Sequence, residues 1–259
     1  MAQPSSPSGS QTESRPDSLS PRVQQLVQDS VALLRKSVLD FRDVVYSNSL
    51  GLEAMVLTDL IWMHVPEIGI FTIDTGRLND ETLGLLDRLE RRYERRFDIF
   101  YPDAAAVEAY VRNNGINGFY VGLEERQSCC QVRKVGPFRR AIEGKKAWVT
   151  GVRREQSTER AQGEALSWDD RYDLWKISPL LDWTEAEVNE YIKVKSLIYN
   201  PLHDKGFPSI GCAPCTRAVE PGADPRSGRW WWENPDTREC GLQPRRKVIP
   251  IAVDSRRVG

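Results

Sequence analysis

Five cysteines are the residues of this 259-residue sequence that point most directly to chemistry. Cys129 and Cys130 are adjacent, Cys212 and Cys215 are two residues apart, and Cys240 stands alone near the C-terminus. Adjacent cysteines converge poorly on one atom, whereas a zinc site usually draws spaced pairs around a single ion. They can serve two irons of a larger cluster, and four thiolates are the usual ligands of a 4Fe–4S cluster. We interpret the first four cysteines as ligands of one metal centre and Cys240 as a nucleophile.

This interpretation has alternatives. The four cysteines could be buried or redox-active without metal, or could hold a structural zinc ion, and Cys240 could be an incidental surface residue. The sequence has no signal-like start and no apolar run near the roughly 20 residues that span a bilayer. We therefore expect a cytoplasmic protein, in which clustered cysteines indicate metal or catalysis more often than disulfides. A net charge of −1 gives no expectation of binding nucleic acid or an acidic membrane.

Three further segments could bind an anion. Hydroxyls and backbone amides in Ser47–Gly51 suit an oxyanion at a helix N-terminus, although an ordinary serine-capped helix is an equal alternative. Arginines in Gly151–Arg160 offer forked donors for phosphate or sulfate, unless they form only a solvated basic loop. Arg226 and Arg229 add positive charge beside three consecutive tryptophans, 230–232, which could stack on a base or plug a loop-rich region.

The elements that would position these residues alternate between strands and helices. Strands are predicted at 41–46, 68–73, 97–101, 146–150 and 174–177, and helices at about 23–34, 53–63, 80–96, 104–112 and 184–194. This alternation predicts an α/β fold with a doubly wound, mostly parallel sheet, in which ligands bind beyond the carboxyl ends of the strands. The loops at 47–51, 74–77 and 151–157 all follow predicted strands, so we expect them on one rim.

The composition predicts three regions. Residues 1–20 are polar and are expected to form a disordered tail. Residues 21–228 are expected to form a single α/β domain, which becomes rich in proline and loops after about residue 196. Residues 229–259 are expected to form a C-terminal segment that carries Cys240 on a mobile hinge.

In several of these segments the chain resembles the assimilatory adenylyl-sulfate reductases, relatives of the phosphoadenylyl-sulfate reductases. The matching segments occur in order between about residues 40 and 243. They are Ser49–Glu53, Asp74–Leu78, Cys129–Lys134, Trp148–Ser157, Ser209–Thr216, Gly228–Glu233 and Glu239–Leu242.

The resemblance implies a fold like that of the adenine-nucleotide α-hydrolases and the reduction of adenylyl sulfate to sulfite and AMP by a dithiol protein such as thioredoxin. It implies a 4Fe–4S cluster on Cys129, Cys130, Cys212 and Cys215, with Cys240 as nucleophile. It also implies a homo-oligomer, because relatives assemble as dimers or tetramers. The substrate-binding residues that we expect are Ser47, Ser49, Gly51, Asp74, Thr75, Gly76, Lys134, Gly151, Arg153, Arg160, Arg226 and Arg229.

The sequence departs from many relatives at two positions and leaves three other functions open. Ala54 stands where many have aspartate, and Gln243 where many have histidine, which leaves arginines as the candidates to activate Cys240. The nearest alternative is a reductase that prefers the 3′-phosphorylated substrate or accepts both. More distant alternatives are an enzyme of the same fold that uses ATP to adenylate or thiolate a substrate, and an iron–sulfur sensor without catalysis.

Overall fold

The structure, a computed structural model, describes residues 18–156, 158–234 and 242. The strands in this part of the chain are β1 (Val44–Asn48), β2 (Gly69–Ile73), β3 (Asp98–Phe100), β4 (Ala147–Val149), β5 (Leu166–Asp169) and β6 (Leu174–Ile177). The α-helices are α1 (Pro21–Phe41), α2 (Leu52–His64), α3 (Asp80–Tyr93), α4 (Ala104–Asn114), α5 (Leu123–Cys130), α6 (Gly136–Ala141), α7 (Thr158–Ala161) and α8 (Glu185–Lys195).

The strands form one sheet in the order β3-β2-β1-β4-β6-β5. Every pairing is parallel except that of β5 with β6, in which Trp168 lies opposite Trp175. The chain returns to the centre of the sheet after β3, so the strand order reverses between β1 and β4. The predicted doubly wound, mostly parallel sheet is confirmed, while the antiparallel edge strand β5 was not predicted.

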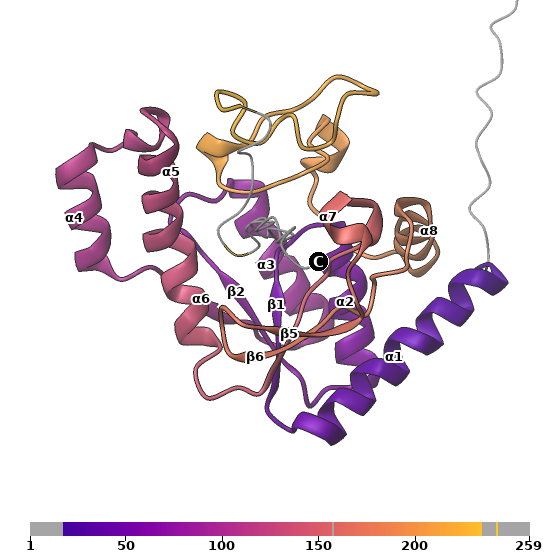
Figure 1. The fold of residues 1–259 in the computed structure, drawn as a ribbon. Coiled ribbons are helices and arrows are strands. Elements are labelled where there is room, and N and C mark those ends of the chain that lie inside the picture. Colours follow the sequence, from indigo (N-terminus) through magenta and orange to yellow (C-terminus); the bar gives the residue numbers. More distant parts are fainter. Residues whose placement is uncertain (1–17, 157, 235–241, 243–259) are drawn as a thin grey trace, which may run out of the picture.

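Both faces of the central strands are buried. Val44 and Tyr46 of β1 belong to a core shared with α1, α2 and α8, whereas Val45 belongs to a second core on the opposite face with Phe138 of α6. Successive side chains of a strand point to opposite faces, so a strand covered on both sides needs a continuous apolar run. Figure 1 shows this arrangement, with α1, α2 and α8 away from α6.

Two parts of the chain differ from the predicted elements. The first strand was predicted from residue 41 but begins at Val44, because α1 continues through Phe41 and ends where Arg42 adopts a φ of 59°. The stretch between α4 and β4, to which no element was assigned, contains α5, a π-helical turn at Gln131–Val135 and α6. Such π-helical turns are rare and often lie at functional sites.

The structure describes the start of the predicted domain but not all of the segment that follows it. Within the predicted tail, Ser20 caps α1 by accepting from the backbone N–H of Val23, and its own backbone N–H donates to Glu190. Residues 1–17 lie outside the described residues, as does the predicted nucleophile Cys240. After α8 the described chain contains two short 3₁₀ turns, His203–Lys205 and Ala213–Cys215, and an isolated bridge between Thr216 and Arg229. This segment crosses above the upper ends of the central strands (Figure 1).

Candidate active site and cysteine cavity

The three loops predicted to share one rim, at 47–51, 74–77 and 151–157, meet because β1, β2 and β4 are neighbours in the sheet. They surround a cavity of about 430 Å³, here called the substrate cavity. Asp74 and Gly76 are absent from its lining, and the Asp74 carboxylate accepts the backbone N–H of Gly76 at 2.8 Å. The other predicted substrate-binding residues line it, namely Ser47, Ser49, Gly51, Thr75, Lys134, Gly151, Arg153, Arg160, Arg226 and Arg229.

Asn48 shapes the loop that follows β1. Its side chain donates to Thr58 at 2.7 Å and accepts the backbone N–H of Leu50 at 2.8 Å, which fixes Leu50 at a φ of 61°. Gly51 then caps α2 without a side-chain hydrogen bond to the first turn. Backbone amides at such a helix N-terminus favour an anion, so this end of α2 suits a phosphate or sulfate in the cavity.

The loop after β4 is held by a carboxylate from α2. Glu53 Oε1 accepts from Arg153 Nε at 2.8 Å and from Gln156 Nε2 at 2.9 Å, and Arg153 also donates to Glu155. The Arg153 guanidinium, although it lines the cavity, is therefore engaged by two carboxylates. Its main visible role is to fix the loop against α2, and Glu53 is a site residue that sequence reasoning missed.

Arg229 is held by a close approach of backbone. It is buried, and its Nη1 lies 3.4 Å from Ser209 Oγ and 3.3 Å from the carbonyl oxygen of Ile210. A Cβ on Gly211 would come within 2.3 Å of Arg229 Nη2, so only glycine leaves room for this guanidinium. The segment Ser209–Cys212 thus positions the Arg229 guanidinium and also supplies one of the cysteines.

The four described cysteines line a second cavity, of about 30 Å³, here called the cysteine cavity. Cys129 and Cys130 come from the end of α5, just before the π-helical turn, and Cys212 and Cys215 flank a 3₁₀ turn. Burial raises the pKa values of the Cys129 and Cys215 thiols, and the neighbouring cysteine sulfurs raise that of Cys215 further. Within the described residues, no three His, Cys, Asp or Glu side chains converge where one metal ion could bind.

The two cavities share a wall. Thr75, Lys134, Cys212 and Arg229 line both of them. The Thr75 hydroxyl lies 3.2 Å from Cys212 Sγ, and its carbonyl oxygen accepts from Arg133 at 2.9 Å. The loop after β2 therefore separates the two cavities rather than lining only the substrate cavity.

The consecutive tryptophans pack beside the cysteine cavity. Trp230 is buried and lines it, together with Arg126 of α5. Trp231 and Trp232 form edge-on contacts with each other, and Trp232 also contacts Tyr120 with centroids 4.5 Å apart. None of the three tryptophans lines the substrate cavity, so the structure favours their interpretation as a hydrophobic plug.

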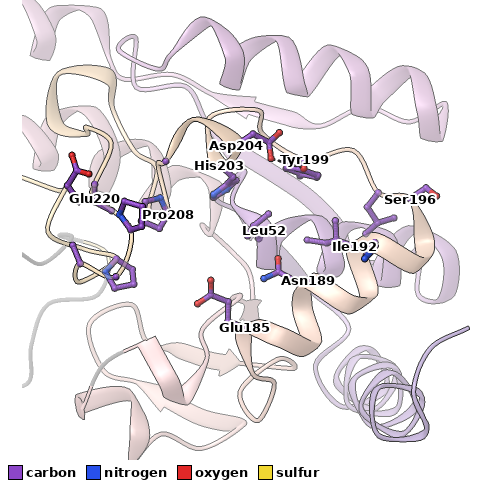
Figure 2. A pocket seen from close by; sticks show the side chains of 18 residues that line it. Leu52, Glu185, Asn189, Ile192, Ser196, Tyr199, His203, Asp204, Pro208 and Glu220 are labelled. Carbon is purple, nitrogen blue, oxygen red and sulfur yellow. Dashed lines mark hydrogen bonds between the residues drawn. The ribbon is translucent and has the colours of Figure 1, made fainter. Parts of the chain in front are cut away.

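A larger cavity, of about 1040 Å³, adjoins the substrate cavity between α8 and the segment at 199–225. Figure 2 shows Glu185, Asn189 and Ile192 along one wall, with His203 and Pro208 on the other side. Glu185, His203 and Pro208 line both this cavity and the substrate cavity. Burial lowers the pKa of His203, which favours the neutral form of its imidazole at this junction.

Leu242 is the described residue nearest in sequence to the predicted nucleophile, and it lines the substrate cavity. Its carbonyl oxygen accepts from Arg171 Nη1 at 2.9 Å, and its side chain joins the core that includes Phe138 and Trp148.

In the part of the chain that the structure describes, no helix has the length and apolarity needed to cross a membrane.

Known proteins match the chain in both sequence and structure. Curated relatives include proteins named adenosine 5′-phosphosulfate reductase from Allochromatium vinosum, 49% identical over 85% of this chain and 86% of the relative, and from Burkholderia cepacia, 47% identical over 86% and 90%. A solved phosphoadenylyl-sulfate reductase from Candida auris has a TM-score of 0.64 and 25% identity, covering 78% of this chain and 98% of that one.

The fold is also found outside reductases. The FMN adenylyltransferase of Candida glabrata superposes with a TM-score of 0.55 at 16% identity, over 88% of this chain and 81% of that one, which indicates a shared fold alone. The predicted likeness to adenine-nucleotide α-hydrolases is thereby confirmed at the level of fold. Residues 43–218 match the phosphoadenosine phosphosulfate reductase domain, which is more than half of the chain. The chain therefore belongs to the phosphoadenosine phosphosulfate reductase family.

Proposed function

We propose that this protein reduces adenosine 5′-phosphosulfate to sulfite and AMP in sulfate assimilation. One observation carries the proposal: a cavity at the carboxyl ends of the central strands, lined by five basic and four acidic side chains, shares a wall with a cavity lined by four cysteines. The relatives named adenosine 5′-phosphosulfate reductase, 44–49% identical, support this substrate over its 3′-phosphorylated form. We also propose that the protein acts in the cytoplasm, as the sequence predicts.

The proposed reaction uses Cys240 as nucleophile. Its thiolate attacks the sulfur of the phosphosulfate, the bond from that sulfur to the phosphate oxygen breaks, and AMP leaves. A dithiol protein such as thioredoxin then attacks Cys240 Sγ, which releases sulfite and forms a mixed disulfide, and its second thiol restores Cys240. The dithiol supplies two electrons and is oxidised to a disulfide, and the substrate sulfur is reduced to sulfite.

The cavity supports this use of Cys240 in two ways. Leu242, which follows Cys240 by two residues in the sequence, lies on the cavity wall. The lining residues Lys134, Arg160, Arg226 and Arg229 carry positive charge. Cations at this position offset the repulsion between thiolate and sulfate and stabilise the charge that develops on the leaving phosphate.

The cysteine cavity has the donor set for a 4Fe–4S cluster, which we propose Cys129, Cys130, Cys212 and Cys215 hold. Burial makes uncompensated thiolates at Cys129 and Cys215 costly, and a bound metal centre would offset that cost. Trp230 lies on the cavity wall, and its buried Nε1 has no hydrogen-bond partner among the described residues. When bound, the cluster would join the two cysteine pairs structurally, since thiols carry both electrons.

The test is sulfite release by anaerobically purified protein with a reduced dithiol protein. Adenosine 5′-phosphosulfate and its 3′-phosphorylated form are compared side by side, with Cys240→Ser as the control that binds substrate and releases no sulfite. A brown, iron-containing sample with strong preference for the first substrate supports the proposal. Turnover by Cys240→Ser would refute the role of Cys240, and a colourless zinc-containing sample would refute the cluster. Homo-oligomerisation stays a prediction for mass measurement in solution.

A further inference from the structure

The substrate cavity has two unlike ends. The wall that it shares with the cysteine cavity carries two cations, Lys134 and Arg229. Among the described residues that line both it and the larger cavity, there is a carboxylate and no arginine or lysine. These residues are Leu52, Glu185, His203, Pro208 and Pro225. The cavity is therefore polarised, with positive charge at one end, here called the cysteine end, and Glu185 at the other, here called the α8 end.

The two helices that begin at this cavity also differ in their first turns. Gly51 precedes α2 without a side-chain hydrogen bond to that turn, so backbone amides there can receive an anion. At α8, Thr184 and Glu187 form a reciprocal capping box, and the backbone N–H of Glu185 donates to the Glu155 carboxylate at 2.9 Å. Carboxylates thus already occupy the N-terminus of α8, where a phosphate would otherwise be favoured, whereas the start of α2 is open to one.

The carboxylate of Glu185 adds a negative charge that the described cations do not pair with. Figure 2 shows its side chain extending from the start of α8 into the space that His203 and Pro208 border from the other side. Within the described chain this carboxylate forms no ion pair, whereas Arg153 is held by two other carboxylates of the same cavity. A group that enters the α8 end therefore meets an uncompensated negative charge.

His203, across this space, suits an uncharged polar group. Its Nε2 is buried and has no hydrogen-bond partner in the described part of the chain, although the residue lines both cavities. Burial lowers its pKa, which favours the neutral imidazole. A buried polar atom without a partner costs free energy, and a hydroxyl, which can both donate and accept, would remove that cost.

The proposed substrate is polarised in the same way as the cavity. Adenosine 5′-phosphosulfate carries its negative charges on the phosphosulfate, while its ribose and adenine are uncharged. Charge complementarity places the phosphosulfate at the open start of α2 and at the cysteine end, beside Lys134 and Arg229. The nucleoside then extends toward the α8 end, where a ribose hydroxyl can bond His203. A phosphate on the 3′-oxygen would bring roughly two more negative charges to that end.

We infer that the α8 end of the substrate cavity receives the ribose, and that Glu185 is a specificity-determining residue that disfavours nucleotides with a 3′-phosphate. This inference rests on the proposed function, because it takes an adenosine nucleotide as the ligand of the cavity. The physical cause is repulsion between like charges. Water weakens that repulsion because Glu185 is exposed, so one carboxylate is expected to supply about tenfold discrimination.

The test is calorimetric titration of the full-length, iron-loaded protein with two probes, AMP and adenosine 3′,5′-bisphosphate. Neither probe contains a sulfate group, so binding is measured without turnover. Glu185→Gln removes the negative charge, and Glu185→Lys reverses it. Glu220→Gln is the matched control, because Glu220 lines the larger cavity but not the substrate cavity. The thermal midpoint of each variant checks that it is folded.

Wild type is expected to bind AMP about tenfold more tightly than the bisphosphate. This preference should fall about tenfold in Glu185→Gln and about 100-fold in Glu185→Lys, and should keep the wild-type value in Glu220→Gln. An unchanged preference in both folded Glu185 variants would overturn the inference. An equal fall in the Glu220 control, or a wild-type protein that binds both probes equally, would overturn it as well.

Failure of the proposed function is distinguishable from failure of this inference. It would appear as the absence of sulfite release from adenosine 5′-phosphosulfate by the wild-type protein, a result that does not enter the nucleotide titrations.

Discussion

Gly211→Ala is expected to displace an arginine from the substrate cavity without removing any charged residue. The new Cβ would lie 2.3 Å from Nη2 and 2.6 Å from Cζ of Arg229, far inside van der Waals contact. The obstacle is the end of a long side chain rather than backbone, so the guanidinium is expected to move and the fold to survive. Arg229 Nη1 lies 3.4 Å from Ser209 Oγ and 3.3 Å from the carbonyl oxygen of Ile210.

The magnitude follows from what Arg229 is proposed to bind. A hydrogen bond to a charged group contributes about 1.5–3 kcal/mol, and every 1.4 kcal/mol is tenfold in affinity. Gly211→Ala is therefore expected to weaken binding of adenosine 5′-phosphosulfate by roughly 10- to 100-fold. The free energy of unfolding is expected to fall by about 1 kcal/mol, mainly because Arg229 loses its cation–π contact with Trp230, in which Cζ lies 4.5 Å from the ring centroid.

The assay is calorimetric titration of the Cys240→Ser background with substrate, so that binding is measured without turnover. Iron content is measured for each variant, because Gly211 precedes Cys212. Gly84→Ala is the folding control: its Cβ meets nothing within 4 Å on an exposed part of α3. Unchanged affinity in an iron-loaded Gly211→Ala protein would refute the role of Arg229 in binding the anion.

Three further predictions follow from other contacts. Gly228→Ala should destabilise strongly and lower iron content, because its Cβ would lie 2.3 Å from the backbone oxygen of Arg217, and thermal unfolding with iron analysis checks this. Asp59→Ala should cost about 2–5 kcal/mol, because the hydroxyls of the buried Tyr191 and the half-buried Tyr93 lose their acceptor, as measured by urea unfolding. The lowered pKa of His203 means that the unfolded chain binds its proton more readily, so this residue's contribution to stability is full above about pH 6.5 and is lost as pH falls. His203→Gln should therefore show a smaller fall in thermal midpoint between neutral and mildly acidic pH than wild type.

Much of the fold could be predicted because local patterns and burial agree. The apolar runs of β1, β2 and β4 are continuous since both faces are covered, and the Thr184–Glu187 capping box marks the start of α8 as predicted. No element was predicted in the stretch 115–146, where α5 and α6 are short and are joined by a π-helical turn. Their packing against other segments, rather than local propensity, determines them.

The sequence alone determined the kinds of group that the site contains: clustered cysteines, a serine-rich helix start, and arginines after strands. The types of residue and their spacing indicate this chemistry, and both can be read directly from the sequence. Only the tertiary structure decided which of these groups share a cavity. It placed Arg153 against Glu53 and separated Asp74 and Gly76 from the lining of the substrate cavity.

The structure also decided the partners that have no sequence signal. Arg126 and Glu233 are 107 residues apart and look like ordinary charged residues, yet they form a buried bidentate pair. Segments that are distant in the sequence bury these two side chains, so the sequence neighbours of neither residue could reveal the burial. The physical reason is general: residue type fixes what a side chain can do, and the fold fixes the water, charge and neighbours that decide what it does.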